Sequence, residues 1–460
     1  MAQTGGAGPH YIGAYVHTSQ RLREILMPTR RSFLSKLGRS AAAAGAFTTI
    51  PTKWTTTIAT ARELSATPGS PEEIAQNEEF WLDIQQAFTT DRSLVNLNNG
   101  GVSPTPAHVL EAMKRDLDFA NQMPVYNGWE ILEPQREGIR ARLARQWDVD
   151  SEEVAITRNT SESLQILQMG YDLQRGDEVV TTTQDYGRMV TTFKQRERRE
   201  GIVLKQFKIP IPAEDPDEIV RLFEQQITDR TRMILMCHMI NITGQVLPVR
   251  EVVAMARSYE IPVLIDGAHS LAHHEFKISE LGCDNYTTSL HKWLHAPIGT
   301  GMLYVKKDEI PNVWPLQAAA ESQNDDIRKF EQIGTHPEAN FLAIGEALTF
   351  HQLIGGKRKE ARLVYLRNRW AEALLDLDNV RLNTSLKPGF AYGIANVQIE
   401  GIETSLLRNW LWDKHQIFTV PINHPEFTGL RVSPSTYTTL EELDRFIDAM
   451  TRASKYGILT

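Results

Sequence analysis

Two charged side chains, Asp266 and Lys292, occur in segments that the sequence predicts to be buried. Asp266 follows the apolar run 262–265, and a carboxylate at a buried strand end is costly unless it meets a positive or proton-donating partner. Lys292 lies among apolar and aromatic residues, where its pKa can fall enough for the amine to attack a carbonyl cofactor. Each residue has an ordinary alternative, since Asp266 can cap the next helix and an isolated lysine is more often a surface residue.

Hydroxyl, amide and aromatic side chains follow three other predicted strands. Residues 158–163 follow the run 154–157 and open a helical segment. Hydroxyls and free amides at a helix N-terminus suit an anion, best of all a phosphate, although simple capping would use the same residues. Tyr186 follows the next strand and places an aromatic over the same cleft, unless it is a core residue. Asn241, after the run 233–236, adds a hydrogen-bonding amide.

Phosphate-binding hydroxyls, a stacking aromatic, a carboxylate for a pyridinium nitrogen and a lysine are together the groups that hold pyridoxal 5′-phosphate (PLP). A zinc site is the rival, because His269 and His273 are four residues apart, with His274 and Glu275 adjacent. No His-Glu-x-x-His motif or paired-cysteine spacing supports it. Neither glycine pattern of a Rossmann or P-loop nucleotide site occurs. The sequence therefore predicts PLP and no metal.

A sheet whose strand ends meet is needed to bring these groups together. From about residue 154, short β-branched runs alternate with amphipathic helical segments, such as the helix that Pro248 opens and that continues to Tyr259. This alternation predicts an α/β fold with a mostly parallel sheet covered on both faces. Ligands of such sheets bind at the carboxyl ends of the strands. An earlier segment, residues 74–88, has the spacing of one helix.

The pattern predicts three parts after residue 61. Residues 62–105 form a linker and an N-terminal segment, residues 106–345 the large PLP-binding domain, and residues 346–460 a small C-terminal domain. The boundary near residue 346 rests on a change of pattern. The elements expected beyond it are a long helix over 357–375, short strands around Val397 and a closing helix over 440–453.

Residues 1–61 have the features of a bacterial export signal. Arg30 and Arg31 precede a weakly apolar stretch, 41–50, and small residues at 59–61 suit cleavage. The paired arginines predict recognition by the twin-arginine export machinery and a periplasmic protein. Translation is expected to begin at Met27, which makes residues 1–26 non-native. The alternative is a cytoplasmic protein in which the basic segment is an amphipathic helix of the folded domain.

Composition limits the class of protein and of partner. The chain has 460 residues, 41% hydrophobic and 23% charged, as in ordinary soluble globular proteins. Its net charge of −8 argues against a general nucleic-acid or membrane-surface binder and favours a small-molecule partner. No stretch beyond the leader has the apolar length of a membrane helix, so we expect no membrane span in the mature protein. Cys237 and Cys283 are too few for a disulfide framework or a four-thiolate metal site.

Six motifs along the chain resemble those of one enzyme family. They are the segments 97–104, 157–162, 266–269, 289–294, 334–335 and 431–434. From about Phe80 to Ala453 the sequence is similar to class V aminotransferase-fold enzymes, which are fold type I PLP proteins, and most of all to their isopenicillin N epimerase-like branch. The resemblance implies a large domain with a mostly parallel, seven-stranded sheet between helices and a smaller α+β C-terminal domain.

The resemblance also implies roles for the residues around the cofactor ring. Lys292 would be the Schiff-base lysine, and Asp266 would be the partner of the pyridine nitrogen. Tyr186 would stack on the ring, while Asn241 and His269 would hydrogen-bond on the side of the ring oxygen.

The remaining motif residues would bind the phosphate and the substrate. The phosphate ligands would be Thr160, Ser161, Ser289 and His291, joined by Thr335 from the neighbouring subunit of a homodimer with a shared active site. Arg431 would clamp the substrate carboxylate with two hydrogen bonds, a geometry that arginine provides better than lysine. Asn99 is expected to bind the substrate as well.

We therefore expect a PLP-dependent enzyme that acts at the α-carbon of an amino acid or of an amino-acid-ended peptide. Epimerisation and transamination stay open, and elimination of a β-substituent, as in a C–S lyase, is the alternative. A more distant alternative is an exported binding protein of the same fold that has lost catalysis. Cysteine desulfurase activity is not expected, because it needs a nucleophilic cysteine between the lysine and the arginine and residues 293–430 contain none.

Overall fold

The computed structural model describes residues 66–458. The expected export signal, residues 1–61, lies outside this range, so it stays a prediction. Among the described residues, no helix combines the length and the apolar character needed to cross a membrane.

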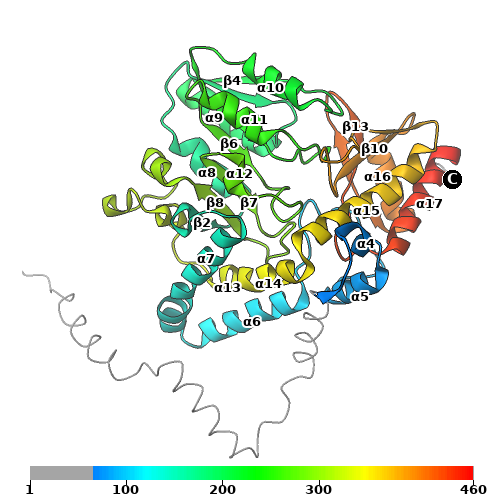
Figure 1. The fold of residues 1–460 in the computed structure, drawn as a ribbon, viewed down its shortest axis with the longest axis horizontal. Coiled ribbons are helices and arrows are strands. Elements are labelled where there is room, and N and C mark those ends of the chain that lie inside the picture. Colours follow the sequence, from blue (N-terminus) through cyan, green and yellow to red (C-terminus); the bar gives the residue numbers. More distant parts are fainter. Residues whose placement is uncertain (1–65, 459–460) are drawn as a thin grey trace, which may run out of the picture. The chain divides into compact units, whose positions relative to one another are not determined.

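A seven-stranded sheet with the order β2-β8-β7-β6-β5-β3-β4 forms the centre of the large lobe (Figure 1). Its strands are β2 (Val154–Thr157), β3 (Glu178–Thr182), β4 (Val203–Phe207), β5 (Thr231–Cys237), β6 (Val263–Asp266), β7 (Asn285–Ser289) and β8 (Gly301–Val305). Only β8 runs against its neighbours; β2 therefore points the same way as the other five. The expected mostly parallel sheet is confirmed.

Each face of this sheet packs on its own apolar core. Along β6, Leu264 and Ile265 point to opposite faces, as successive strand residues must. Helices α8 (Thr160–Gly170) and α9 (Gly187–Glu200) cover the face that Leu264 joins. The core of the other face takes residues from α7 (Arg136–Gln146), α10 (Pro216–Glu224), α11 (Val249–Arg257), α12 (Ile278–Leu281) and α14 (Ile344–Ile354). Burial on both faces explains why these strands are continuous apolar runs.

The N-terminal region differs from the single helix expected over residues 74–88. Two helices form instead, α4 (Pro71–Ala75) and α5 (Glu78–Gln86). Asn77 separates them, because its side-chain oxygen accepts a hydrogen bond from the Phe80 N–H at 3.2 Å and so caps a new helix. The next helix in the chain is α6 (Ala107–Gln122), which contacts α13 (Ala339–Leu342) from much later in the sequence.

The C-terminal lobe contains a four-stranded antiparallel sheet of order β12-β13-β10-β9. Its strands are β9 (Val380–Leu382), β10 (Ala395–Ile399), β12 (Val420–Asn423) and β13 (Thr428–Val432), and its helices are α15 (Gly356–Leu375), α16 (Thr404–His415) and α17 (Leu440–Tyr456). Short π- and 3-10 helices complete the described elements: η1 (Tyr126–Leu132), η2 (Glu133–Gln135), η3 (Ser151–Glu153), η4 (Lys307–Asn312), η5 (Glu321–Gln323) and η6 (Ile327–Glu331).

Two segments join the lobes. Strand β1 (Val95–Asn96) pairs in parallel with β11 (Ile417–Phe418), and Val95 lies in the core of the C-terminal lobe. In helix α15, Leu363 packs in a core of the large lobe and Trp370 packs in the core of the C-terminal lobe. The segment around Val95 therefore packs with the C-terminal lobe, whereas α4 and α5 form an apolar cluster of their own with Phe350, Ile354 and Tyr437.

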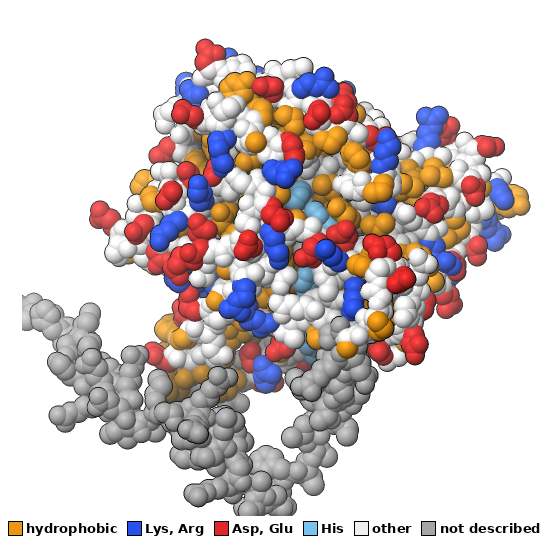
Figure 2. All heavy atoms as spheres, viewed as in Figure 1, with side chains coloured by type: hydrophobic (Ala, Val, Ile, Leu, Met, Phe, Trp, Pro, Cys, Tyr) orange, Lys and Arg blue, Asp and Glu red, His pale blue; other side chains and the backbone are white. Residues whose placement is uncertain are grey.

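Acidic and basic side chains alternate over the face drawn in Figure 2. That face has no broad basic surface, in keeping with the net charge of −8.

Candidate active site

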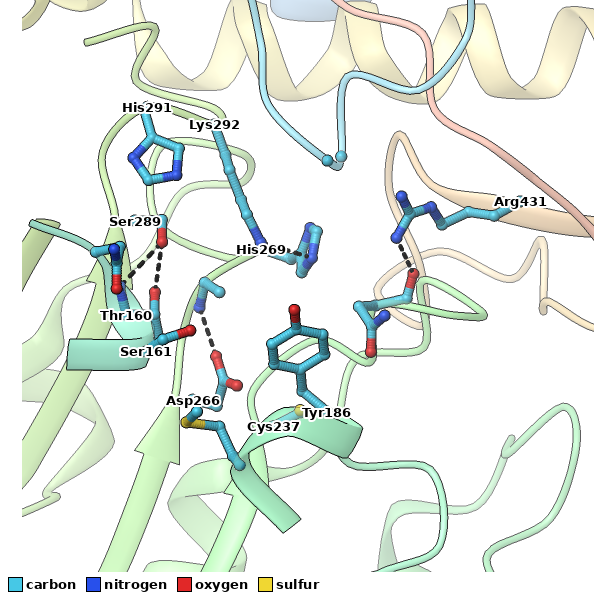
Figure 3. A pocket seen from close by; sticks show the side chains of 16 residues that line it. Thr160, Ser161, Tyr186, Cys237, Asp266, His269, Ser289, His291, Lys292 and Arg431 are labelled. Atoms are coloured by element: carbon cyan, nitrogen blue, oxygen red, sulfur yellow. Dashed lines mark hydrogen bonds between the residues drawn. The ribbon is translucent and has the colours of Figure 1, made fainter. Parts of the chain in front are cut away.

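A pocket of about 360 Å³ opens at the carboxyl ends of the parallel strands (Figure 3). Asp266 ends β6, Ser289 ends β7, and Tyr186 follows β3. The lining residues are Gly100, Gly101, Asn159, Thr160, Ser161, Tyr186, Met189, Cys237, Asn241, Asp266, Ala268, His269, Ser289, His291, Lys292 and Arg431. The structure thus brings together every residue expected to bind cofactor or substrate except Asn99 and Thr335.

One end of the pocket is built from hydroxyls at the N-terminus of α8. The Ser289 hydroxyl accepts a hydrogen bond from the Thr160 N–H at 3.0 Å and lies 2.8 Å from the Thr160 hydroxyl. Asn159 caps the helix by accepting from the Glu162 N–H at 2.9 Å. β8 can approach this turn closely because residue 301 is glycine; a Cβ there would lie 2.6 Å from the Cα of Asn159. Hydroxyls and helix-terminal amides at one place suit a phosphate.

His291 closes the same end. Its Nδ1 lies 3.0 Å from the Thr300 carbonyl oxygen, so Nδ1 carries a proton and donates. Burial lowers the pKa of His291 to about 4, with a further contribution from the charge of Lys292. A bound phosphate would act in the opposite direction, since an anion favours the charged imidazolium.

Lys292 lies beside His269 in the middle of the pocket. Burial lowers the pKa of Lys292 to about 8; the negative charge of Asp266 opposes this, and the positive charge of Arg431 adds to it. The Trp293 indole N–H donates to His269 Nδ1 at 3.5 Å, which leaves the proton of the neutral ring on Nε2. Nε2 is 3.1 Å from Lys292 Nζ, and the amine can accept from it only as the free base. The lowered pKa therefore makes the nucleophilic free base of Lys292 accessible near neutral pH, and His269 can donate to that form.

Asp266 presents a carboxylate at the floor of the pocket. Its Oδ1 accepts from the Ala268 N–H at 3.0 Å, and no described residue donates to Oδ2. Burial raises the pKa of Asp266 to about 6, which still leaves the group mostly ionised at neutral pH. A buried carboxylate with one free oxygen fits a protonated ring nitrogen.

Arg431 reaches the pocket from the side opposite Lys292 (Figure 3). It donates to the Asn241 carbonyl oxygen at 3.2 Å and to Asn98 Oδ1 at 2.6 Å, while its buried Nε has no partner. Burial lowers the pKa of Arg431 to about 10, and no carboxylate in the described chain pairs with it. A buried cation without a counter-charge is costly, so this guanidinium is a site for an anionic group of a ligand.

The structure corrects the expected placement of Asn99. Its side chain is fully buried outside the pocket, donates to the Ser433 carbonyl oxygen at 3.0 Å and accepts from the Tyr437 hydroxyl at 2.7 Å. The preceding residue, Asn98, holds Arg431 instead. Asn98 forms a β-bridge with Ser433 and Asn99 begins a turn, so the two side chains have different surroundings that the sequence alone did not show.

Two further residues differ from what the sequence suggested. Thr335 is exposed and does not line the pocket of its own chain, so its role across a homodimer interface stays a prediction. Cys237, for which the sequence indicated no role, lines the pocket. Burial raises the pKa of its thiol well above the usual value, with the charges of Asp185 and Asp266 contributing. Cys237 is therefore a neutral thiol and a poor nucleophile.

The shifted pKa of Lys292 can be measured directly. In the cofactor-free protein we expect reaction of Lys292 with trinitrobenzenesulfonate, followed by peptide mapping, to rise with pH around a midpoint near 8. Asp266→Asn should move the midpoint down and Arg431→Met should move it up, because the two charges act on the amine with opposite signs. A midpoint near that of a surface lysine, about 10.4, would contradict the geometry above.

The chain is similar to several known proteins over most of its length. Residues 95–446 match the family model described as Aminotransferase class-V. An isopenicillin N epimerase of Amycolatopsis lactamdurans is 27% identical over 401 residues, which cover 82% of this chain and 99% of that protein. A probable cysteine desulfurase of Halalkalibacterium halodurans is 27% identical over 279 residues, 57% of this chain and 68% of that protein. Among solved structures, a C-DES mutant with glycine covalently linked to its PLP cofactor aligns with a TM-score of 0.72 at 20% identity, covering 81% of this chain and 99% of that one.

Proposed function

Since the chain belongs to the aminotransferase class-V family, we propose that it acts at the α-carbon of an amino acid, or of a peptide that ends in a free amino acid. The chain is a PLP-dependent enzyme. When bound, PLP supplies an electron sink for negative charge at the α-carbon. The residues of the pocket fit that cofactor: hydroxyls and helix-terminal amides for the phosphate, Asp266 for the ring nitrogen and Lys292 for the aldehyde.

The buried, unpaired guanidinium of Arg431 is the observation that carries this proposal. It shares a pocket with Lys292, and its charge acts on that amine. An α-amino acid has its carboxylate and its amine on one carbon, so it matches a pocket with a cation at one side and an amine-reactive centre at the other. A substrate without a free carboxylate would leave Arg431 buried and uncompensated.

Proton transfer falls to Lys292. With a pKa of about 8, roughly a tenth of the amine is free base at pH 7, enough to accept a proton from a carbon acid positioned beside it. The His269 Nε2–H, 3.1 Å from Nζ, directs the lone pair of that amine. The Asp266 carboxylate, mostly ionised at neutral pH, would stabilise a positively charged ring nitrogen at the floor of the pocket.

We propose more specifically that the reaction is isopenicillin N epimerase-like, either epimerisation or transamination. Its support is the coverage of almost the whole length of a curated isopenicillin N epimerase. The test is to incubate the holoenzyme with L- and D-amino acids in deuterated water. Exchange with inversion indicates epimerisation, keto-acid formation indicates transamination, and loss of a β-substituent indicates lyase chemistry. No exchange with any amino acid or amino-acid-ended peptide would overturn the proposal.

Arg431→Lys tests the recognition of the carboxylate. We expect kcat/KM for an amino acid to fall roughly ten- to hundred-fold, about 1.5–3 kcal/mol, because an ammonium cannot reproduce a two-pronged contact. The matched control is the amide of the same amino acid, whose kcat/KM should change little, since it offers no carboxylate. Equal losses on acid and amide would place the carboxylate elsewhere.

A further inference from the structure

His273 lies behind the pocket wall and connects the two lobes. The Gly393 N–H donates to His273 Nε2 at 2.8 Å. A backbone N–H can only donate, so Nε2 is the accepting nitrogen. Burial lowers the pKa of His273 to about 3, and the neutral ring therefore carries its proton on Nδ1.

That proton is directed at the pocket. His273 Nδ1 lies 2.8 Å from the carbonyl oxygen of His269 and donates to it. His269 is the residue whose Nε2 faces Lys292 Nζ. A continuous path of hydrogen bonds thus runs from Gly393 in the C-terminal lobe, through the His273 ring, to the histidine that orients the lysine.

The ring of His273 also supports the lysine segment from behind. It stacks on the Trp293 indole with ring centroids 3.7 Å apart and an interplanar angle of 28°. Trp293 follows Lys292 in the chain, and its carbonyl oxygen accepts a hydrogen bond from the buried amine of Lys359 on α15. Trp293, the chain neighbour of Lys292, is therefore held by two buried residues that do not line the pocket.

Gly393 is attached to the strand pair that carries Arg431. It lies just before β10, and Asn396 of β10 pairs with Arg431 of β13. The fit around it is tight, because a Cβ on residue 393 would come 2.9 Å from His273 Nε2 and 3.0 Å from Leu363 Cβ. A shift of this strand pair must therefore displace His273.

We propose that His273 is a positioning residue that ties His269 and Lys292 to the strands of Arg431, so that the amine end and the carboxylate end of the pocket keep a fixed separation. This inference depends on the function proposed above, in which Arg431 binds the substrate carboxylate. His273 touches neither cofactor nor substrate in this arrangement; it acts through His269 and Trp293.

Three substitutions separate the two hydrogen bonds. His273→Asn places an amide near the position of Nδ1 and keeps only the bond to His269. His273→Gln reaches the position of Nε2 and keeps only the bond to Gly393. His273→Phe keeps the stacking on Trp293 and loses both bonds. If His273 must bond both His269 and Gly393, each of the three variants should bind PLP about tenfold more weakly than the wild type in equilibrium dialysis. The pH midpoint of the visible absorption of each holoenzyme variant should also differ from that of the wild type.

The kinetic expectation is a split between kcat and KM. We expect kcat to fall about tenfold in all three variants, with KM for an amino acid within about twofold, because Arg431 keeps its bonds to Asn98 and Asn241. Gly393→Ala should reproduce these effects from the other lobe, since its methyl group displaces the His273 ring.

His274→Phe is the matched control. His274 is the next residue, is also buried, and stacks on Tyr392 with ring centroids 4.4 Å apart, but no hydrogen bond connects it to His269. It should retain wild-type PLP affinity and pH midpoint. Wild-type values in His273→Asn or His273→Gln, or equal losses in His274→Phe and His273→Phe, would overturn the proposal. Failure of the unaltered enzyme to process any amino acid would instead overturn the proposed function.

Discussion

Lys292→Ala is expected to lose turnover on the order of 10⁴-fold, because it removes both the amine that bonds the cofactor and the group that moves the proton. Borohydride reduction of the wild-type holoenzyme, followed by peptide mapping, should find the reduced pyridoxyl group on Lys292. In Lys292→Ala no peptide should carry it. The thermal melting temperature of the two apoproteins should be similar, since Lys292 forms no ion pair in the described chain.

Lys359 makes this result informative. It is fully buried, and burial lowers its pKa to about 7, below that of Lys292. Judged by pKa alone, Lys359 would be the better nucleophile, but its amine bonds the Trp293 carbonyl oxygen and does not line the pocket. A reduced pyridoxyl group on Lys359, or on any residue other than Lys292, would show that the pocket has been assigned to the wrong lysine.

Asp266→Asn should retain PLP yet lose turnover on the order of 10²- to 10³-fold. The amide oxygen can keep the hydrogen bond from the Ala268 N–H, so the floor of the pocket stays in place. The amide of the variant carries no negative charge and presents an N–H in place of a carboxylate oxygen. It therefore cannot stabilise a protonated ring nitrogen. Spectroscopic titration of the variant with PLP and steady-state kinetics measure the two quantities separately.

Asp185 supplies the control for this substitution. It is a second buried carboxylate, and it accepts from the Thr181 hydroxyl, the Thr182 N–H and the Cys237 N–H at 2.7–2.8 Å. It does not line the pocket. Asp185→Asn should therefore lower the free energy of unfolding by about 1–3 kcal/mol with a small effect on kcat. Full activity of Asp266→Asn, or a similar loss in both variants, would remove Asp266 from its assigned role.

The sequence predicted the strands that are apolar on both faces and overlooked one that is not. β2, β3, β5 and β6 are buried runs of the expected type. β7, with the sequence Asn-Tyr-Thr-Thr-Ser, is equally buried. Two of its polar side chains bond to the neighbouring strand: Thr287 donates to the Ile265 carbonyl oxygen at 2.8 Å, and the Asn285 side-chain oxygen accepts from the Ile265 N–H at 3.2 Å. Such compensation depends on a neighbouring strand and leaves no periodic pattern in the sequence.

The candidate site could likewise be predicted from the sequence only in part. Strand ends were predictable from the alternation of runs, and the chemistry of the residues near them pointed to Asp266 and Lys292. Arg431 was named only through the resemblance to class V enzymes. Asn99 was predicted to bind the substrate, but its side chain bonds Ser433 and Tyr437 outside the pocket, while the neighbouring Asn98 contacts Arg431. The link from Gly393 to His273 uses a backbone N–H, which has no signature in the side chains.

The pairing of β1 with β11 sets the order in which a newly made chain can finish its pocket. A ribosome adds about 5–20 residues each second, so roughly 15–65 s separate the synthesis of Val95 from that of Ile417. During that interval Val95 has no partner strand, and Gly100 and Gly101, just beyond it, lack the lobe that places them in the pocket. Arg431 emerges later still. A nascent chain stalled after α16 therefore contains Lys292 and Asp266 but lacks Arg431 and the strand that carries it, so its pocket is incomplete.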